Sequence, residues 1–196
     1  MVGRSLQSRL SLSFPVVALA AAALSLPACG GHDMAHSTSG KGNAEDSMFV
    51  TAMVPHHEGA VEMAKLAETR AKRPEVKAFA ATILSSQAAE IARMKEMKKG
   101  MGDASHHGDG RSSSAMSDHE MGMDGDMGKL AKSRQFDRDF LEMMIPHHEG
   151  AVKMSRKAID GGIDPEVKQL ARSIVKSQQA EIDQMKRWLK DWYGQA

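Results

Sequence analysis

The sequence predicts an all-α protein, an antiparallel four-helix bundle made of two repeated helical hairpins. A long segment occurs twice, since "MVPHHEGAVEMA" at residues 53–64 returns as "MIPHHEGAVKMS" at residues 144–155. Apolar residues in each copy recur at three- and four-residue spacing, the period of an amphipathic helix, and no β-hairpin pattern is found. A repeated hairpin with one apolar face needs its twin to bury that face, which favours a bundle.

Each repeat is interpreted as two helices, with the histidine phrase on the first of them. The second helix of the first repeat begins at Pro74, because proline suits the first helical position. Its counterpart begins at Pro165 after Asp164, a good N-cap. The helix before it is expected to end at Gly161 and Gly162, a helix stop signal. The predicted hairpins cover residues 44–100 and 131–196.

The segment between the hairpins has an unusual composition. Residues 101–128 contain no leucine, isoleucine, valine or aromatic residue, so burial cannot offset the entropy of ordering. We therefore expect a disordered linker over residues 101–130. A flexible linker needs only glycine and serine, so its methionines and histidines indicate a metal-binding tract, with accidental enrichment as the alternative. The tract comprises His106, His107, Met116, His119, Met121, Met123 and Met127.

The first residues have the features of a bacterial export signal. Arg4 and Arg9 precede an apolar run at residues 14–26, shorter than the roughly 20 residues of a membrane-spanning helix. The "LPAC" that follows resembles the lipobox of bacterial lipoproteins. We expect a signal peptide over 1–28, a lipid on Cys29, the only cysteine, and a flexible tail over 29–43. An ordinary secreted protein with one thiol is the alternative.

The overall composition excludes one class of partner and suggests another. The chain has 26 Lys plus Arg against 25 Asp plus Glu, so the charge pattern of a nucleic-acid-binding protein is absent. Aromatic residues make up only 4%, whereas there are 16 methionines and 9 histidines. Methionine at this frequency can be core filler, so its positions decide the interpretation.

The repeated phrase places sulfur and imidazole on one helical face. At about 100° per residue, His56 falls in a stripe between Met53 and Met63, and the second repeat reproduces this stripe. The neighbouring histidine of each pair is expected at the flank of the stripe, and Glu58 on the opposite side. Pro55 and its counterpart lie inside the helical pattern, where proline usually kinks the helix. Such a kink could turn the flanking histidine inward.

The second helices add a polar position to otherwise apolar stripes. Gln87 and Gln178 occupy it, and a buried amide without a partner is costly. Gln87 is therefore expected to bond His56. A purely structural histidine–glutamine network is the alternative to a metal site.

Thioether sulfur is soft and imidazole is borderline, which suits Cu(I), or Ag(I) by analogy, over hard cations. A di-iron bundle would need Glu-x-x-His pairs, and no glutamate here has a histidine three residues later. Zinc is a weaker candidate, because it more often uses cysteine or histidine–carboxylate sets. Binding should weaken as the pH falls through about 6.5, where histidine protonates. The candidate ligands are Met53, His56, His57, Met63, Met94, Met144, His147, His148, Met154 and Met185.

The two histidine phrases, each followed by a helix of the "SQ-AEI--MK" kind at residues 86–95 and 177–186, resemble the domain-of-unknown-function family 305. The resemblance implies a ferritin-like four-helix bundle. It also implies a link to copper, because some members of the family are periplasmic or surface proteins implicated in copper binding and copper tolerance. The implied motif positions are Met53, His56, His57 and Met63, then Met144, His147, His148 and Met154. The linker is not part of that motif.

The sequence thus predicts a lipid-anchored envelope protein, facing the periplasm or the cell surface, that sequesters copper or passes it on. Its expected partners are the metal ion and a membrane reached through the lipid; the sequence identifies no protein partner. No acid–base pair or nucleophile arrangement is found, so binding is expected rather than turnover. A ferritin-like metal oxidoreductase and a structural envelope module are the alternatives. Two half-sites facing one core are preferred over two separate sites.

Overall fold

The structure, a computed structural model, describes residues 42–101, 117, 119 and 121–194. All regular secondary structure within these residues is helical, which confirms the predicted all-α bundle. A short helix that the sequence did not predict lies between the two hairpins. The helices are α1 (Ala44–Arg70), α2 (Pro74–Met101), α3 (Met127–Lys132), α4 (Phe136–Gly161) and α5 (Pro165–Tyr193).

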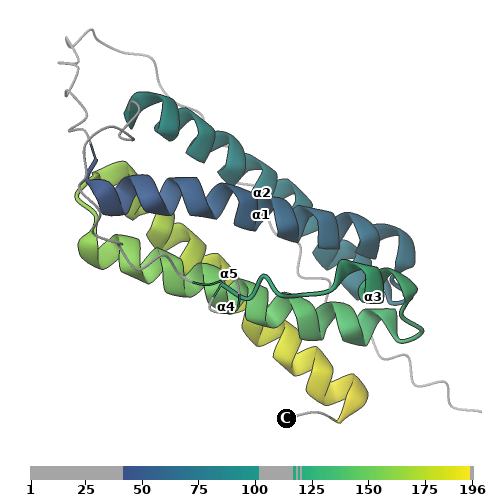
Figure 1. Cartoon of the computed structure of the whole chain (residues 1–196). Coiled ribbons are helices and arrows are strands. Elements are labelled where there is room, and N and C mark those ends of the chain that lie inside the picture. The colour runs from purple at the N-terminus through teal and green to yellow at the C-terminus, as the bar shows by residue number, and fades with distance from the viewer. Residues whose placement is uncertain (1–41, 102–116, 118, 120, 195–196) are drawn as a thin grey trace, which may run out of the picture. The chain divides into compact units, whose positions relative to one another are not determined.

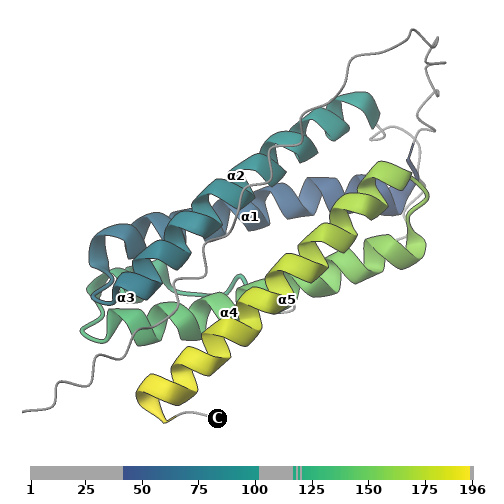
Figure 2. The same cartoon turned by 180° about the vertical axis from the view of Figure 1, so that it is seen from behind.

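The bundle has a central pair of helices. α1 packs against α2 and α4 against α5, and the two hairpins meet mainly through α1 and α4, which lie side by side (Figure 1). Seen from behind, α2 and α5 lie in front of α1 and α4 (Figure 2). Because α1 and α4 are covered both by each other and by a hairpin partner, each can bury two adjacent positions of the histidine phrase.

The helix ends follow local capping rules. Asn43 and Asp46 form a capping box at the start of α1, each accepting a hydrogen bond from the backbone N–H of the other. Asp164 caps α5 as predicted, accepting from two backbone N–H groups ahead of it. α4 ends at Gly161, with Gly162 as its C-cap, which confirms the predicted stop. α1 continues through Pro55 and α4 through Pro146.

Two buried aspartates join the hairpins reciprocally. Asp46 of α1 is fully buried and accepts hydrogen bonds from the backbone N–H groups of Ile163 (2.9 Å) and Asp164 (3.1 Å), in the turn between α4 and α5. Asp137 of α4 accepts hydrogen bonds from the backbone N–H groups of Lys72 (2.8 Å) and Arg73 (2.9 Å), in the turn between α1 and α2. The start of each central helix therefore fixes the turn of the other hairpin, which sets the antiparallel register of α1 and α4.

The end of the linker is ordered, contrary to the disorder expected over 101–130. Residues 127–132 form α3, with Leu130 buried, and residues 121–126, called the strap here, lead into it. The strap lies against α4 because glycine permits a close approach. A Cβ on Gly150 would stand 2.0 Å from the carbonyl oxygen of Met121, and one on Gly122 (φ +68°) would stand 2.1 Å from that of Pro146.

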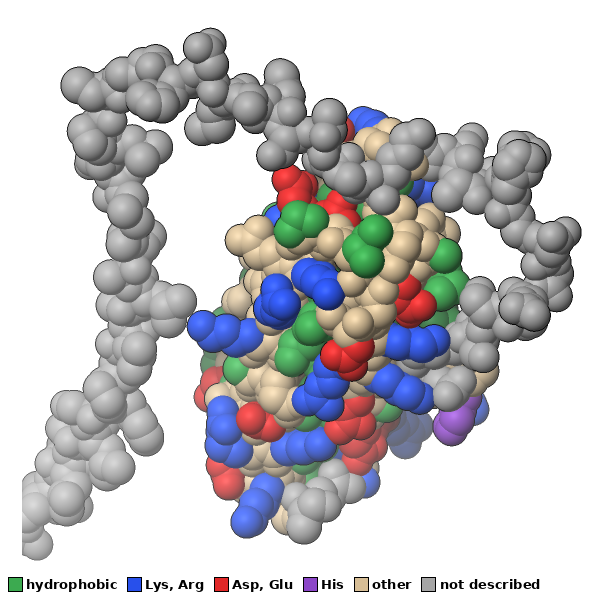
Figure 3. Space-filling view, turned by 90° about the vertical axis from the view of Figure 1, so that its left-hand side faces the viewer, with side chains coloured by type: hydrophobic (Ala, Val, Ile, Leu, Met, Phe, Trp, Pro, Cys, Tyr) green, Lys and Arg blue, Asp and Glu red, His purple; other side chains and the backbone are tan. Residues whose placement is uncertain are grey.

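Within the described part of the chain, no helix combines the length and the apolarity that are needed to cross a membrane. On the side drawn in Figure 3, basic and acidic side chains are interspersed, and hydrophobic side chains show only as small separate areas. This side of the molecule therefore carries mixed charge.

Candidate metal centre

The centre of the molecule holds two histidines from different hairpins. The rings of His56 on α1 and His147 on α4 have centroids 3.9 Å apart and planes inclined by 41°. His56 is fully buried and His147 is 4% exposed. The two repeats therefore meet at one point through the same residue of the phrase, and the inward-facing histidine of each stripe is where the sequence predicted it.

The two rings differ in their hydrogen bonds. Nε2 of His56 lies 2.9 Å from the carbonyl oxygen of Met121 in the strap, while its Nδ1 has no partner. Neither ring nitrogen of His147 has a partner among the described residues. A carbonyl only accepts, so Nε2 of His56 carries the proton and Nδ1 keeps a free lone pair. The half-sites are thus chemically unequal.

The predicted bond between His56 and Gln87 is wrong. Nε2–H of His56 donates its hydrogen bond to the strap carbonyl instead, and the side-chain amides of Gln87 and Gln178 have no hydrogen-bond partner within the described part of the chain. Both amides are 2% exposed. The sequence could not reveal this, because it gave no reason to place a linker carbonyl in the core.

Burial keeps the central pair uncharged. It lowers the pKa of His56 from its usual 6.5 to about 4, and the hydrogen bond to the Met121 carbonyl only partly opposes this. Burial also lowers the pKa of His147 well below its usual value, helped by the nearby His56. Both rings are therefore neutral near pH 7, in the form that binds metals. Proton competition at His56 is expected nearer pH 4 than the 6.5 expected from the sequence, and at His147 it is likewise expected well below 6.5.

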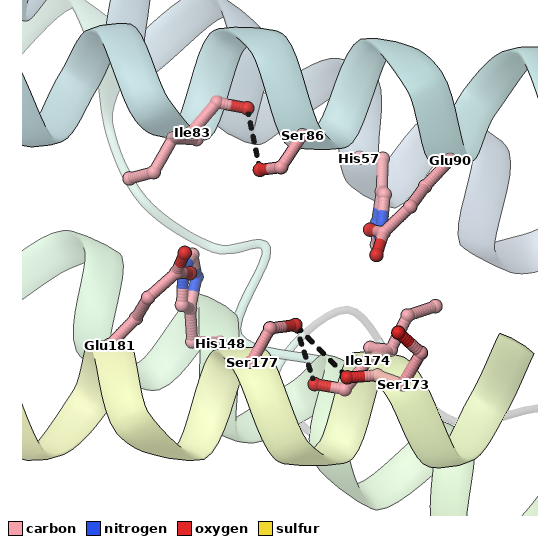
Figure 4. Close-up of polar contacts among 9 residues, drawn as sticks. All are labelled: His57, Ile83, Ser86, Glu90, His148, Ser173, Ile174, Ser177 and Glu181. Atoms are coloured by element: carbon pink, nitrogen blue, oxygen red, sulfur yellow. Dashed lines mark hydrogen bonds and ion pairs between the residues drawn. The ribbon is translucent and has the colours of Figure 1, made fainter. Parts of the chain in front are cut away.

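The second histidine of each phrase is also buried, rather than at a flank. His57 and His148 are both 0% exposed, because α2 and α5 cover the sides of α1 and α4 that they occupy. Nε2 of His57 lies 2.8 Å from Oε2 of Glu90, and Nε2 of His148 lies 2.7 Å from Oε2 of Glu181. Figure 4 shows each carboxylate against the ring of its partner. The Nδ1 atoms have no partner.

The six methionines of the predicted ligand set are all buried, and they are divided between two hydrophobic clusters. Each group of three combines two methionines of one repeat with one of the other, and the two groups belong to separate hydrophobic clusters. Each cluster therefore contains sulfur atoms from both repeats. The first group is Met53, Met94 and Met154, and the second is Met63, Met144 and Met185.

The glutamates of the two phrases point outward, as expected. Glu58 and Lys95 pair at 2.9 Å on the surface, and Glu149 pairs with Lys186 at 2.7 Å. All four side chains are about half exposed. They lie beside the buried histidines in sequence without contributing to the centre.

The linker tract is divided in the structure. His119 is exposed and pairs with Asp124, and Met123 is half-buried. Met121 packs against the hydrophobic cluster that contains Met53, and Met127 packs against the cluster that contains Met63. No group of three His, Cys, Asp or Glu residues within the described ranges is placed to hold a metal ion. The predicted positions that lie outside the described residues are His106, His107, Met116 and Cys29.

Sequence reasoning missed the partners of the histidines. The contact of His56 with the Met121 carbonyl could not be predicted from the sequence, because every residue has a main-chain carbonyl and the residue type does not indicate which one will accept. The glutamates did leave a signal, since each follows its histidine by 33 residues in both repeats. A charged residue kept at the same register in two copies is a sign of a fixed contact.

These features define a small all-α bundle with a buried histidine–methionine centre built from two repeats. The chain belongs to the DUF305 family, a domain of unknown function, whose model matches residues 46–189.

Solved structures of similar proteins share the fold. CopM in its Cu(I)-bound form is 36% identical with a TM-score of 0.64, over 76% of this chain and 98% of that one; CopM is also known in Ag-bound and Cu(II)-bound forms. A putative secreted DUF305 protein from Streptomyces coelicolor is 30% identical with a TM-score of 0.65, over 75% and 91%. An uncharacterized protein of Acanthamoeba polyphaga mimivirus is 47% identical over 49 residues, 25% of this chain and only 32% of that relative.

Proposed function

We propose that this protein binds Cu(I), and Ag(I) as its analogue, at a centre formed by His56, His147 and the two methionine clusters. The observation that carries the proposal is the neutral imidazole pair, with unpartnered ring nitrogens, in a core whose two hydrophobic clusters each contain three buried thioethers. Thioether and neutral imidazole together favour soft monovalent ions. Binding there would sequester copper or hold it for transfer to another protein.

The cost of the arrangement supports a role beyond packing. A buried polar atom without a partner costs about 1 to 3 kcal/mol, and three ring nitrogens of the central pair are in this state. An apolar pair of similar volume would fill the same space without that cost. The similarity to CopM, which has solved structures in Cu(I)-bound and Ag-bound forms, supports the same assignment.

We further propose that the protein is exported and anchored through a lipid on Cys29, and that it acts by binding rather than turnover. The support is the sequence pattern at residues 1–29. Expressed in a bacterium with a lipoprotein pathway, the wild type should fractionate with membranes, and Cys29→Ser should appear in the soluble fraction. Equal fractionation of both would contradict the anchor.

The metal proposal is tested by competition titration with a chromogenic Cu(I) chelator under anaerobic, reducing conditions. His56→Ala/His147→Ala should lower the affinity by at least tenfold, about 1.4 kcal/mol. Glu58→Ala/Glu149→Ala, which truncates two exposed side chains of the same two phrases, is the matched control and should change the affinity little. Unchanged affinity in the double variant would remove the central pair from the site.

The sulfur contribution is tested separately with leucine, which keeps the core volume nearly constant. The variant Met53→Leu/Met94→Leu/Met154→Leu and its repeat-related triple Met63→Leu/Met144→Leu/Met185→Leu should each fold and each bind Cu(I) more weakly. Wild-type affinity in both triples would leave histidine alone as the ligand and argue against a soft site.

A further inference from the structure

Two carboxylates make the same contact in the two halves of the molecule. Glu90 on α2 and Glu181 on α5 each bond Nε2 of a histidine on the neighbouring helix, at 2.8 and 2.7 Å (Figure 4). The rings are fully buried, whereas the carboxylates are 18% and 16% exposed. Each carboxylate therefore reaches from the edge of the bundle to the outer nitrogen of a ring whose other nitrogen lies in the interior.

The contact determines which ring nitrogen keeps a lone pair. A carboxylate oxygen accepts the hydrogen bond, so the proton of the neutral ring is on Nε2 and Nδ1 is left bare. In both rings Nδ1 is buried and has no partner. His56 reaches the same state by a different route, since its Nε2 donates to the Met121 carbonyl. Three of the four buried histidines thus present a bare Nδ1.

We propose that Glu90 and Glu181 are positioning residues that hold His57 and His148 as Nε2–H tautomers, so that Nδ1 of each ring is a ligand for a soft monovalent ion. The inference rests on the proposed function and adds one histidine of each hairpin as a ligand beside the central pair. It does not place three or more histidines around one ion, a grouping that the described residues do not show. A histidine that binds a metal commonly donates its other N–H to a carboxylate, which fixes the ring and increases its basicity. The exposed edges of Glu90 and Glu181 keep them in contact with solvent, so they need not be fully desolvated.

A purely structural role makes different predictions. If the pairs only hold α2 to α1 and α5 to α4, their loss should change stability without changing the ring nitrogen that meets the metal. Ring nitrogens are distinguished by long-range ¹H–¹⁵N correlation spectra, which report the tautomer of each histidine in the metal-free protein and the nitrogen that responds when Ag(I) is added.

The test compares the wild type with Glu90→Gln/Glu181→Gln. The matched control is Glu58→Gln/Glu149→Gln, which makes the same charge change at residues next to His57 and His148 but on the exposed surface. In the wild type we expect Nε2–H tautomers for His57 and His148 and a shift of both Nδ1 resonances on adding Ag(I). The Glu90/Glu181 variant should bind Cu(I) roughly 10- to 100-fold more weakly, and the control should match the wild type.

The outcomes separate the two proposals. Nδ1–H tautomers in the wild type, or an Ag(I) response at Nε2 or at neither nitrogen of His57 and His148, would overturn this inference while leaving the central site intact. Wild-type Cu(I) affinity in a folded Glu90/Glu181 variant would do the same. If that variant does not fold, the wild-type spectra with Ag(I) still decide. A wild type that binds neither Cu(I) nor Ag(I) would overturn the proposed function and this inference together.

Discussion

His56 and His147 occupy the same place in two copies of one phrase, and their rings lie 3.9 Å apart at the contact between α1 and α4. Their surroundings are nevertheless different. The strap carbonyl of Met121 binds His56, whereas His147 has no hydrogen-bond partner among the described residues. A duplicated sequence has therefore produced one shared centre with two unequal halves, and the linker is the source of the inequality.

The first prediction concerns the two glycines of the phrases. Gly150→Ala should displace the strap, because its Cβ would stand 2.0 Å from a main-chain oxygen, and we expect a loss of about 1–3 kcal/mol in the free energy of unfolding. Gly59→Ala is the repeat-related control. Its Cβ would come no nearer than 3.4 Å to another group, so a gain of about 0.5–1 kcal/mol is expected from helix propensity.

Urea denaturation gives both values, and the ring ¹⁵N–H signal of His56 reports the strap directly. In Gly150→Ala this signal should lose its hydrogen-bonded shift. Equal stability of the two variants would mean that the strap does not lie against α4 as described.

The second prediction concerns the buried aspartate of α1. Asp46→Ala removes the acceptor for three backbone N–H groups, those of Asn43, Ile163 and Asp164. Buried donors left unpaired are costly, so we expect a loss of about 3 kcal/mol in unfolding free energy. Asp183→Ala, at an exposed position of α5, is the control and should change stability by less than about 0.5 kcal/mol. A small effect at Asp46 would contradict its role in joining the hairpins.

The third prediction concerns acid. The pKa of His56 is about 4 in the folded protein, whereas the usual histidine value of 6.5 applies to the unfolded chain. The unfolded chain therefore binds the proton more tightly. The associated stability is complete above about pH 6.5 and is lost as the pH falls toward 4. His147, whose pKa burial also lowers, acts in the same direction. Between pH 6 and pH 5 the shift at His56 alone should cost the metal-free protein about 1.2 kcal/mol, and His147 should add to this loss.

Urea titrations at a series of pH values measure this slope. In His56→Asn/His147→Asn the slope over the same range should be much flatter, because asparagine does not titrate. An identical slope in that variant would assign the acid sensitivity to other groups.

The fourth prediction concerns the bound metal. A ligand that binds only the folded state adds about 2.7 kcal/mol at a free concentration 100 times its dissociation constant. For a domain of this size, that corresponds to a rise in Tm of roughly 5–10 °C. Calorimetry with Cu(I) held by a weak competing ligand should show the rise, and Mg²⁺ should not reproduce it. A Tm insensitive to Cu(I) would favour a purely structural role for the buried histidines.

Much of the fold followed from the sequence because it depends on local patterns. The repeat, the three- and four-residue spacing and the Gly161–Gly162 stop are each readable in the chain, and they gave the hairpins. The burial of His56 between two methionines followed from the same spacing. Helical periodicity, however, describes one face at a time. It placed His57 at a flank, because it could not show that α1 is covered on two sides.

The remaining features depend on tertiary contacts that no local pattern describes. The bond from His56 to the Met121 carbonyl joins residues 65 positions apart, and the bond from Ile163 to Asp46 joins residues 117 apart. The strap was predicted to be disordered because its composition lacks large apolar residues. What orders it is main-chain contact through Gly122 and Gly150, which composition does not reveal.

The exchange of aspartates between the hairpins has a consequence for how such a molecule can arise. In a polypeptide with one copy of the repeat, the buried aspartate would have no second turn to accept hydrogen bonds from. The backbone N–H groups of its own turn would likewise lack an acceptor. Two such polypeptides placed antiparallel would satisfy each other, so a one-copy ancestor is expected to have lived as a homodimer. A fusion of the two copies would then allow them to diverge, and among the described residues the connecting peptide bonds the ring of His56 and not that of His147.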